Sequence, residues 1–388
     1  MDIRALVLVS KAVEAAADPM PVSPLAPALL EVAGKTALQR TVERLREFGI
    51  QSATVITDSD FLVSEDSEDE QGTTYQATPR ERFWRAAENA FNDLAQEGAE
   101  LVLLMHLGGY AEINLEKFVQ FHLDQRARVT QASAPGEPLR IFCISASRRN
   151  DAASLFRSQL SRCRSECPFF EHEGYFNPLR EARDLRQLAI DILTLKTETK
   201  PCGSEMRSGV WIERKAVIEK GARVLAPAFI GAFARIRSHA VVTRCSSVEH
   251  HAEIDCGSVV ENSTVLPYCR VGAGLDVAHS VVGAGVLANL RRDVTVEIAD
   301  RKLVGFVVAG RGQQFLSAAF ELATYLPKQM WRGLFGPSQP QPRDLRTALH
   351  DTSPSLGGAA GYQTSACDTD AAEKFPSNLA VARRYGHQ

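Results

Sequence analysis

The sequence predicts an α/β domain built on a mostly parallel sheet, followed by a triangular β-solenoid. Two observations carry this prediction. In the first 200 residues, short apolar runs alternate with amphipathic stretches of helical spacing, which is typical of a parallel sheet covered by helices. From residue 212 onward a six-residue repeat of aliphatic side chains replaces that alternation.

The N-terminal elements follow from local spacing. Helices are predicted where apolar residues recur every three or four positions, at residues 36–48, 80–94 and 114–125. Strands are predicted at the short branched runs 5–9, 52–57 and 100–105. The acidic run 58–72 is interpreted as a solvated loop.

The repeat sets the second half of the fold. Ten aliphatic residues follow one another at steps of six: Ile212, Ile218, Val224, Ile230, Ile236, Val242, Val248, Ile254, Val260 and Leu266. Four residues after each of the first nine comes a small one, and Arg270 then ends this second column: Ala216, Ala222, Ala228, Ala234, Ala240, Ser246, Ala252, Ser258 and Thr264. The large side chains are expected to fill a prism and the small ones to fit its corners, whereas a six-residue period does not match a helix. After Leu266 the frame is expected to slip twice by one residue, through Val271, Val277 and Val282, and to end near residues 289–293.

Composition limits the function classes. The chain has 388 residues, 45% of them hydrophobic and 23% charged, and a formal charge of −3, so a strongly basic nucleic-acid binder is not expected. No run approaches the roughly 18 apolar residues that span a bilayer. Eight irregularly spaced cysteines without an export signal favour free thiols in the cytoplasm.

Residues 209–290, which begin GVWIERKAVIEKGARV, resemble the left-handed parallel β-helix of hexapeptide-repeat proteins, with about four coils. The handedness is implied by that resemblance, not by the spacing. Further segments resemble, in the same order, the sugar nucleotidyltransferases (NDP-sugar pyrophosphorylases such as mannose-1-phosphate guanylyltransferase). They are ALVLV, LLEVAGKTALQRTVERLREFGI, LVLLMHLGGYAEINLEKFVQFHLDQRARVTQA and GYF. The resemblance implies a Rossmann-like nucleotidyltransferase domain at 1–205 and a β-helix at 206–298. A strand and helix segment at 299–336 and a disordered tail at 337–388 would follow.

Such enzymes join a sugar-1-phosphate to a nucleotide with release of pyrophosphate, which requires cations and usually Mg²⁺ around the phosphates. The family's glycine-rich loop is replaced here by residues 10–15 (SKAVEA), and its phosphate-binding lysine by Pro27. Its first metal aspartate falls at Leu107–Gly108 and its second at Pro178, and no base-binding glycine loop occurs near residues 80–85. Glu112 and Asp124 are the nearby carboxylates that remain.

We therefore expect no catalytic or metal-binding residue. Weak residual substrate binding is assigned to four residues: Ser10, Lys11, Gly108 and Gly109. The leading hypothesis is a catalytically degenerate, NDP-sugar pyrophosphorylase-like protein with a regulatory or scaffolding role in nucleotide-sugar or polysaccharide biosynthesis. It would need no cofactor and would bind a nucleotide, a sugar phosphate or protein partners, a second copy included, through the β-helix. The alternative is an active mannose-1-phosphate guanylyltransferase-like enzyme with a rearranged site that uses Mg²⁺.

Other residue groups are weighed against simpler interpretations. A third hypothesis is a hexapeptide acyltransferase, whose base would come from the histidines of the repeat: His239, His250, His251 and His279. Cys163, Cys167 and His172 lack the fourth ligand of a zinc site and favour free thiols. In residues 313–335 an apolar stripe, Phe315, Ala319, Leu322 and Leu326, predicts a helix that covers a solenoid end. Peripheral membrane contact or a dimer contact through the same segment are the alternatives.

Overall fold

The computed structural model describes residues 1–10, 22–23, 25–50, 52–58, 72–135, 137–146 and 167–307. All of them belong to one compact unit, Met1–Gly336. Predictions about Lys11, Cys163, most of the acidic run, residues 313–335 and the tail 337–388 lie outside the described residues. Within the described ranges no helix is long and apolar enough to cross a membrane.

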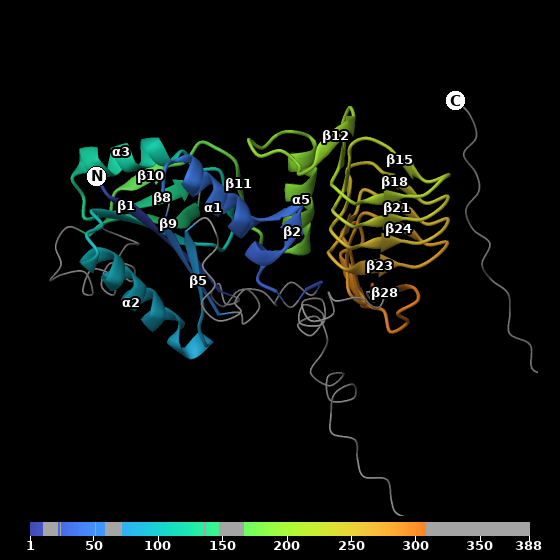
Figure 1. Cartoon of the computed structure of the whole chain (residues 1–388), viewed down its shortest axis with the longest axis horizontal. Helices are drawn as coiled ribbons and strands as arrows, with labels where there is room; N and C mark the ends of the chain where they lie inside the picture. The colour runs from blue at the N-terminus through green and yellow to red at the C-terminus, as the bar shows by residue number, and fades with distance from the viewer. Residues whose placement is uncertain are drawn as a thin grey trace, which may run out of the picture. The chain divides into compact units, whose positions relative to one another are not determined.

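The N-terminal half is built on a seven-stranded, mostly parallel mixed sheet in the order β10-β8-β9-β6-β1-β4-β5 (Figure 1). Its strands are β1 Ile3–Val9, β4 Ala53–Thr57, β5 Thr73–Ala77, β6 Leu101–His106, β8 Val129–Ala134, β9 Glu137–Ser145 and β10 Phe169–Glu171. The three predicted strands are β1, β4 and β6, which pair in parallel as expected. Strand β9 runs antiparallel to both β6 and β8, a reversal that the sequence did not predict.

Helices lie on both faces of this sheet, as the alternation predicted. They are α1 Ala37–Glu47, α2 Phe83–Gln96 and α3 Leu115–Gln125, whereas α5 Ala182–Leu193, a helix outside the predicted set, lies between this sheet and the C-terminal coils (Figure 1). Helix α2 packs against one face through Phe91 and Leu94, and α1 packs against the other through Val42 and Leu45. Residues 80–82, predicted as the first turn of α2, form a short 3-10 helix instead. Thr36 begins α1 with a capping box, its hydroxyl accepting from the Gln39 N–H.

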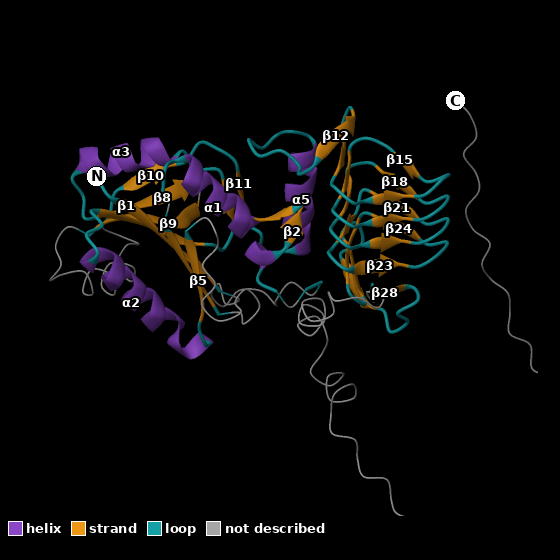
Figure 2. Ribbon diagram, in the orientation of Figure 1, coloured by secondary structure: helices purple, strands orange, loops and turns teal. Residues whose placement is uncertain are grey.

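The C-terminal half forms three mostly parallel sheets, and the chain returns to each of them once per coil (Figure 2). The first sheet contains β12 Ser204–Arg207, β13 Val210–Ile212, β16 Ala228–Ile230, β19 Ser246–Val248, β22 Thr264–Val265, β25 Ser280–Gly283, β26 Val286–Asn289 and β27 Val294–Glu297. The second contains β14 Val217–Ile218, β17 Arg235–Ile236, β20 Glu253–Ile254, β23 Cys269–Val271 and β28 Val304–Phe306. The third contains β15 Arg223–Val224, β18 Val241–Thr243, β21 Val259–Glu261 and β24 Asp276–Ala278. Each coil supplies one strand to each sheet, an arrangement compatible with a β-helix.

Burial agrees with the predicted columns, except at the first coil. Aliphatic residues of the later coils, such as Ile236, Ile254 and Val260, are fully buried, and so are Ala234 and Ser258 of the small column. Both columns therefore face the interior of the coil, the small residues next to the turns. Ser258 also uses its hydroxyl there, donating to the Gly272 carbonyl at 2.6 Å.

The position of the frame slip was predicted one repeat too late. Ile230 pairs with Val248, but Val248 pairs with Val265 and not with Leu266, so the second of these coils is shorter by a single residue. The reason lies in the preceding corner. In the longer coil Arg244 and Cys245 both adopt positive φ, whereas in the shorter coil a single residue, Asn262, does so. Val265 and Leu266 are both aliphatic, so the side-chain pattern alone did not distinguish them.

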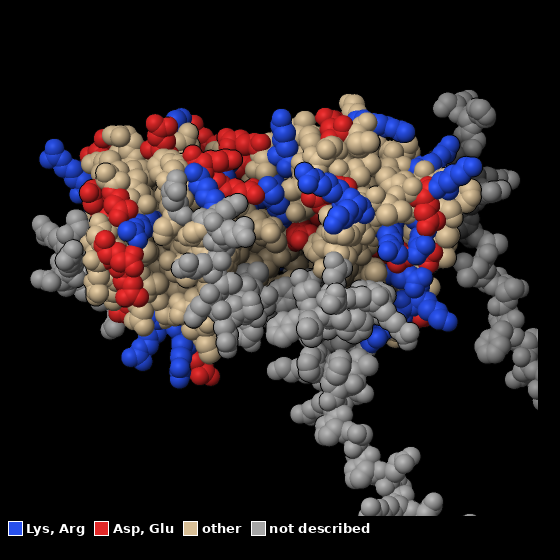
Figure 3. All heavy atoms as spheres, in the orientation of Figure 1, with Lys and Arg blue, Asp and Glu red and all other residues tan. Residues whose placement is uncertain are grey.

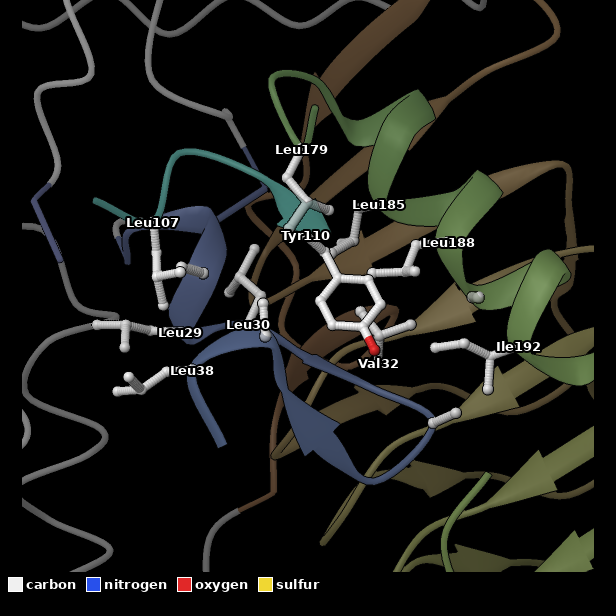
Figure 4. Packing of buried hydrophobic residues seen from close by; sticks show 14 of the residues in the cluster. Leu29, Leu30, Val32, Leu38, Leu107, Tyr110, Leu179, Leu185, Leu188 and Ile192 are labelled. Carbon is white, nitrogen blue, oxygen red and sulfur yellow. The ribbon is translucent and has the colours of Figure 1, made fainter. Parts of the chain in front are cut away.

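The two halves are joined by buried polar contacts as well as by apolar packing. Tyr110 lies among Val32, Leu185 and Leu188 at the junction (Figure 4). Arg186 of α5 donates to the Cys245 carbonyl at 2.6 Å and to the Asn262 side chain at 2.8 Å. Burial lowers the pKa of this guanidinium to about 10.

A second polar contact comes from the β2–β3 turn, where β2 is Glu31–Val32 and β3 is Lys35–Thr36. The Ala33 and Gly34 N–H groups donate to the Glu249 carboxylate at 2.9 and 3.0 Å. Since Glu249 belongs to the coils and the turn to the N-terminal half, these bonds fix one half against the other.

Candidate functional site

The described part of the predicted phosphate region lies where β1 and β6 end side by side. Leu8 pairs with His106 at the carboxyl ends of these parallel strands, and Ser10 follows directly. The Ser10 hydroxyl lies 3.2 Å from His106 Nε2. In open α/β sheets ligands bind outside the carboxyl ends of the strands, so Ser10 is at a suitable place for its predicted role.

His106 connects this serine to a cation. Its Nδ1 lies 3.4 Å from the Arg140 guanidinium. Because a guanidinium only donates, Nδ1 must accept, which leaves the proton on Nε2 to be donated to Ser10. Burial, and then the charge of Arg140, lowers the pKa of His106 to about 4, so the imidazole is neutral at neutral pH. The Trp84 ring packs edge-on against the His106 ring, with 5.5 Å between the two ring centroids.

A pocket opens next to this group. It lies between α1, the segment after β6, strand β9 and the segment after β11 Phe176–Asn177. Its wall includes Gly108 and Gly109, two of the residues predicted to bind substrate, and also Pro178, which stands where the resembled family has its second aspartate. The full lining is Thr41, Arg44, Met105, His106, Leu107, Gly108, Gly109, Ala111, Ile113, Leu115, Glu137, Pro138, Leu139, Arg140, Ile141, Phe176, Pro178 and Arg180.

Gly109 is required by close backbone approach. Strand β7 Tyr110–Ala111 pairs antiparallel with β11, which brings the two backbones together at this point. A Cβ added to Gly109 would lie 2.8 Å from the Asn177 carbonyl oxygen and 3.2 Å from Pro178. Glycine is therefore required at this position by the lack of space for a Cβ in the pocket wall, and not by a positive φ.

The pocket is positively charged. Three guanidiniums line it, those of Arg44, Arg140 and Arg180, against the single carboxylate of Glu137. Glu137 forms an ion pair with Arg180. Arg44 is oriented by the Glu198 carboxylate at 2.9 Å and by the Ile113 carbonyl at 3.2 Å. Guanidiniums recognise phosphate and carboxylate groups with paired hydrogen bonds, so this lining suits an anion.

The nearby carboxylates are not arranged for Mg²⁺. Glu112 is 2% exposed and accepts from the Tyr110 hydroxyl, the Glu198 N–H, and the Thr199 N–H and hydroxyl, at 2.7 to 3.0 Å. Burial raises the pKa of Glu112, but these hydrogen bonds outweigh it and hold that pKa below its ordinary value. Asp124 lies on α3 and accepts from Gln120 at 2.8 Å.

Among the described residues no group of three or more His, Cys, Asp or Glu side chains is placed to hold a metal ion. Mg²⁺ needs hard oxygen ligands, usually with one or two carboxylates. Glu112 is committed to the backbone at 198–199, and Glu137 is paired with Arg180 in a pocket lined by cations. The side chains at this site therefore do not fit the metal that the resembled family uses.

The four histidines of the repeat do not form one site. His239 precedes β18, His250 and His251 follow β19, and His279 precedes β25, so they occupy three different corners of the coil. His279 Nδ1 contacts the Asn262 amide at 2.6 Å. The sequence analysis did not predict that His250 would form an ion pair with Glu31 of the N-terminal half.

His251 belongs to a stacked column. Its ring stacks between those of Phe233 and Tyr268, with centroid separations of 4.7 and 4.8 Å. The Lys215 ammonium lies 4.8 Å from the centroid of the Phe233 ring. Burial, with the neighbouring charges of His250 and Arg235, lowers the pKa of His251 to about 4. No hydrogen-bond partner among the described residues orients its Nδ1. A general base needs such an orienting group, so this geometry favours a packing role.

The prediction of free thiols can be compared with the structure only at the cysteines in the described ranges. Five cysteines in the described ranges, Cys143, Cys202, Cys245, Cys256 and Cys269, are free thiols. Both nitrogens of His172, the other residue weighed for zinc, are engaged, with the Tyr175 carbonyl at 3.1 Å and the Gly174 N–H at 3.3 Å.

The structure thus places Gly108 and Gly109 in one pocket and Ser10 beside it, next to His106. The sequence analysis missed Arg44, Arg140 and Arg180, which come from three separate elements. Comparison with models of known protein families and with the curated proteins finds no match for the chain. The fold and the pocket therefore define the class of protein: a mixed-sheet α/β protein with an arginine-lined pocket, joined to three mostly parallel sheets of repeated coils.

Proposed function

We propose that this protein is a catalytically degenerate relative of the NDP-sugar pyrophosphorylases that binds a sugar phosphate or nucleotide without transferring it. Its role would be regulatory or scaffolding, in nucleotide-sugar or polysaccharide biosynthesis. The observation that carries the proposal is the pocket beside the end of β6. It combines three guanidiniums with a wall made by Gly108, Gly109 and Pro178.

Binding is supported by the charge and shape of this pocket. Arg44, Arg140 and Arg180 supply donors for phosphate oxygens, and Leu139, Ile141 and Phe176 supply apolar surface on the same lining. Thr41 supplies a hydroxyl within that lining. Pockets that combine apolar surface with a few convergent polar groups are typical of small-molecule sites.

The absence of transfer is supported by the fit of the metal site. Attack on the α-phosphorus of a nucleoside triphosphate needs stabilisation of developing charge, and each lost contact of this kind costs about 3 kcal/mol in the transition state. Glu112 and Glu137 are committed elsewhere, and residues 10–15 contain no glycine that would let backbone N–H groups approach a triphosphate. The side chains at the site thus favour binding over turnover.

The finer fold assignment belongs to the same proposal. The repeated coils carry an aliphatic and a small column in each six-residue step, which supports a β-helix of hexapeptide repeats, and the resemblance implies that it is left-handed. A nucleotidyltransferase-like sheet, a boundary near residues 205–206 and a cytoplasmic location complete it.

The test measures binding and turnover separately. Purified protein is titrated calorimetrically with a panel of sugar-1-phosphates and nucleoside triphosphates, and pyrophosphate is measured in the same mixtures with Mg²⁺. We expect heat of binding from at least one phosphate compound, and no pyrophosphate above that of a heat-killed control. Arg140→Gln should weaken binding at least tenfold. The matched control is Arg85→Gln, an exposed arginine of α2 outside the pocket, which should leave it unchanged.

Two results would replace the proposal. Pyrophosphate release well above the control would establish the active, mannose-1-phosphate guanylyltransferase-like alternative. Failure of every compound to bind, or equal loss in Arg140→Gln and Arg85→Gln, would remove the pocket as the ligand site.

A further inference from the structure

The last coil of the solenoid is covered by the chain that follows it. Strand β26 pairs antiparallel with β25, and β27 pairs with β26, which extends the first sheet past the coil. Strand β28 pairs antiparallel with β23 and closes the second sheet. The buried residues Val271 and Val282, which belong to these strands, are fully inaccessible.

The first coil has no such cover among the described residues. Strands β14 and β15 each lie at the edge of their sheet, with a neighbour on one side only. Ile218 is 38% exposed, whereas Ile236 and Ile254, which occupy the same position one and two coils further on, are fully buried. Among the described residues, therefore, nothing covers the interior of the solenoid at this end. Terminal repeats of solenoids need a cover, because an exposed core is costly and promotes association.

The exposed apolar surface extends beyond Ile218. Val217 and Leu225 are each 49% exposed, and Met206 in the neighbouring β12 is 66% exposed. We call Met206, Val217, Ile218 and Leu225 the first-coil patch.

The rim of this patch is basic. The exposed cations of the first coil and the β12 turn are Arg207, Arg214, Lys215, Lys220 and Arg223. The carboxylates of the same coil and of β12 are engaged: Glu213 accepts from the Ala232 N–H, Glu219 from Arg237, and the exposed Glu205 from the Gly209 N–H. Basic side chains gather on the coils in the face shown in Figure 3. A second copy docking end to end would bring these like charges together, which disfavours it.

We propose that residues 315–326 of this chain cover the first-coil patch. These residues carry the apolar stripe of Phe315, Ala319, Leu322 and Leu326, and the one charged residue among them is Glu321. A single carboxylate is the complement of a basic rim, and a stripe of that spacing presents one apolar face to the open core. The core of the last coil, which lies nearer in sequence, is already covered by β26, β27 and β28, although Val294, Val296 and Leu303 of this covering chain are themselves 43 to 48% exposed.

The chain is long enough for this path. The described residues end at Val307, whose N–H donates to the Tyr268 carbonyl at 2.8 Å. Tyr268 lies in the stacked column that runs through His251 and Phe233 to Lys215 of the first coil, three coils away. Neighbouring strands are about 4.8 Å apart, so the distance to span is about 14 Å. Residues 308–314 extend up to about 23 Å.

The experiment measures amide hydrogen exchange of residues 215–225 in the full chain. We expect these amides to be protected, and the double variant Phe315→Asp/Leu322→Asp to speed their exchange at least tenfold. The control is Thr324→Asp, on the opposite face of the predicted helix, which should leave the rate unchanged. Exchange in β6 serves as a check that each variant is folded. A second pair, Ile218→Asp against Ser238→Asp, tests the same contact from the solenoid side by exchange of residues 313–326.

Several outcomes overturn the proposal. Fast exchange of residues 215–225 in the wild type would show that the end is bare. If residues 215–225 stay protected from exchange in the double variant, something other than residues 315–326 covers the first-coil patch. If light scattering shows a lower molecular mass for Ile218→Asp than for the wild type, that cover is a second copy of the chain. Membrane binding of the same segment is tested by sedimentation of the protein with vesicles of phosphatidylcholine that contain a minority of phosphatidylserine. If the double variant abolishes sedimentation with them but leaves residues 215–225 unchanged, the segment serves a membrane instead.

Discussion

Replacing Glu249 with glutamine tests whether the buried junction makes stability depend on pH. Burial and the nearby Glu31 raise the pKa of this fully buried carboxyl from 4.5 to about 7. In the unfolded chain it loses its proton near pH 4.5. Between these values the folded state holds a proton that the unfolded state lacks, so this group's stabilising contribution is fully present below pH 4.5 and is lost as pH rises through about 7.

The size of the effect follows from that interval. A shift from 4.5 to about 7, at about 1.4 kcal/mol per unit, corresponds to about 3 kcal/mol. The group is fully buried, so solvent screening does not reduce this figure. Glutamine does not titrate. Between about pH 5 and about pH 8 we therefore expect the wild type to lose about 2 to 3 kcal/mol more unfolding free energy than Glu249→Gln.

The assay is urea unfolding at several pH values, followed by circular dichroism. The protein contains many other ionisable groups, so the informative quantity is the difference between variant and wild type. The control is Glu297→Gln, an exposed residue of β27, which should follow the wild type. Parallel curves for Glu249→Gln and the wild type would refute the reasoning. They would mean that Glu249 is charged in the folded state throughout this range.

Three further predictions concern packing and hydrogen bonding. Ile254→Ala should lower the free energy of unfolding by about 2 to 4 kcal/mol, because it leaves a cavity in a closed coil. Ile218→Ala, at the end of the solenoid where this side chain is exposed, should lower it by less than about half of that, and urea unfolding measures both. Arg186→Met should cost about 2 kcal/mol in the same assay, since the lost bonds to Asn262 and Cys245 exceed the gain from removing a buried charge. Gly109→Ala should weaken phosphate binding in calorimetry at least fivefold, because its Cβ would force the Asn177 backbone away, and unchanged affinity would contradict this.

The repeat was predictable from sequence because its period is imposed by backbone geometry. A coil with three strands and three turns needs a large inward residue at every sixth position, and Ile236, Val242 and Val248 show that requirement directly. The slip was not predictable. The turn conformation at Asn262 decides whether Val265 or Leu266 faces inward, and both residues suit the interior.

The site was predictable only where neighbours in sequence form it. Gly108 and Gly109 are adjacent and follow a strand, so their place at its carboxyl end could be anticipated. The guanidiniums come from α1, β9 and the segment before α5, and no spacing along the chain relates them. The antiparallel turn of β9 brings Arg140 to His106, and that turn has no signal in the alternation of strands and helices.

The charge of the pocket connects its binding and its lack of a metal site. A carboxylate pair that holds Mg²⁺ must remain ionised and unpaired, yet each cation placed beside it competes for the same oxygens. In this pocket Arg180 takes Glu137, and the backbone at 198–199 takes Glu112. Arg44 and Arg180 are each paired with a carboxylate, Glu198 and Glu137, so the proposed anion would contact Arg140 and share the other two guanidiniums with these carboxylates. The same arrangement therefore favours holding a phosphate group over activating it, as the proposed function requires.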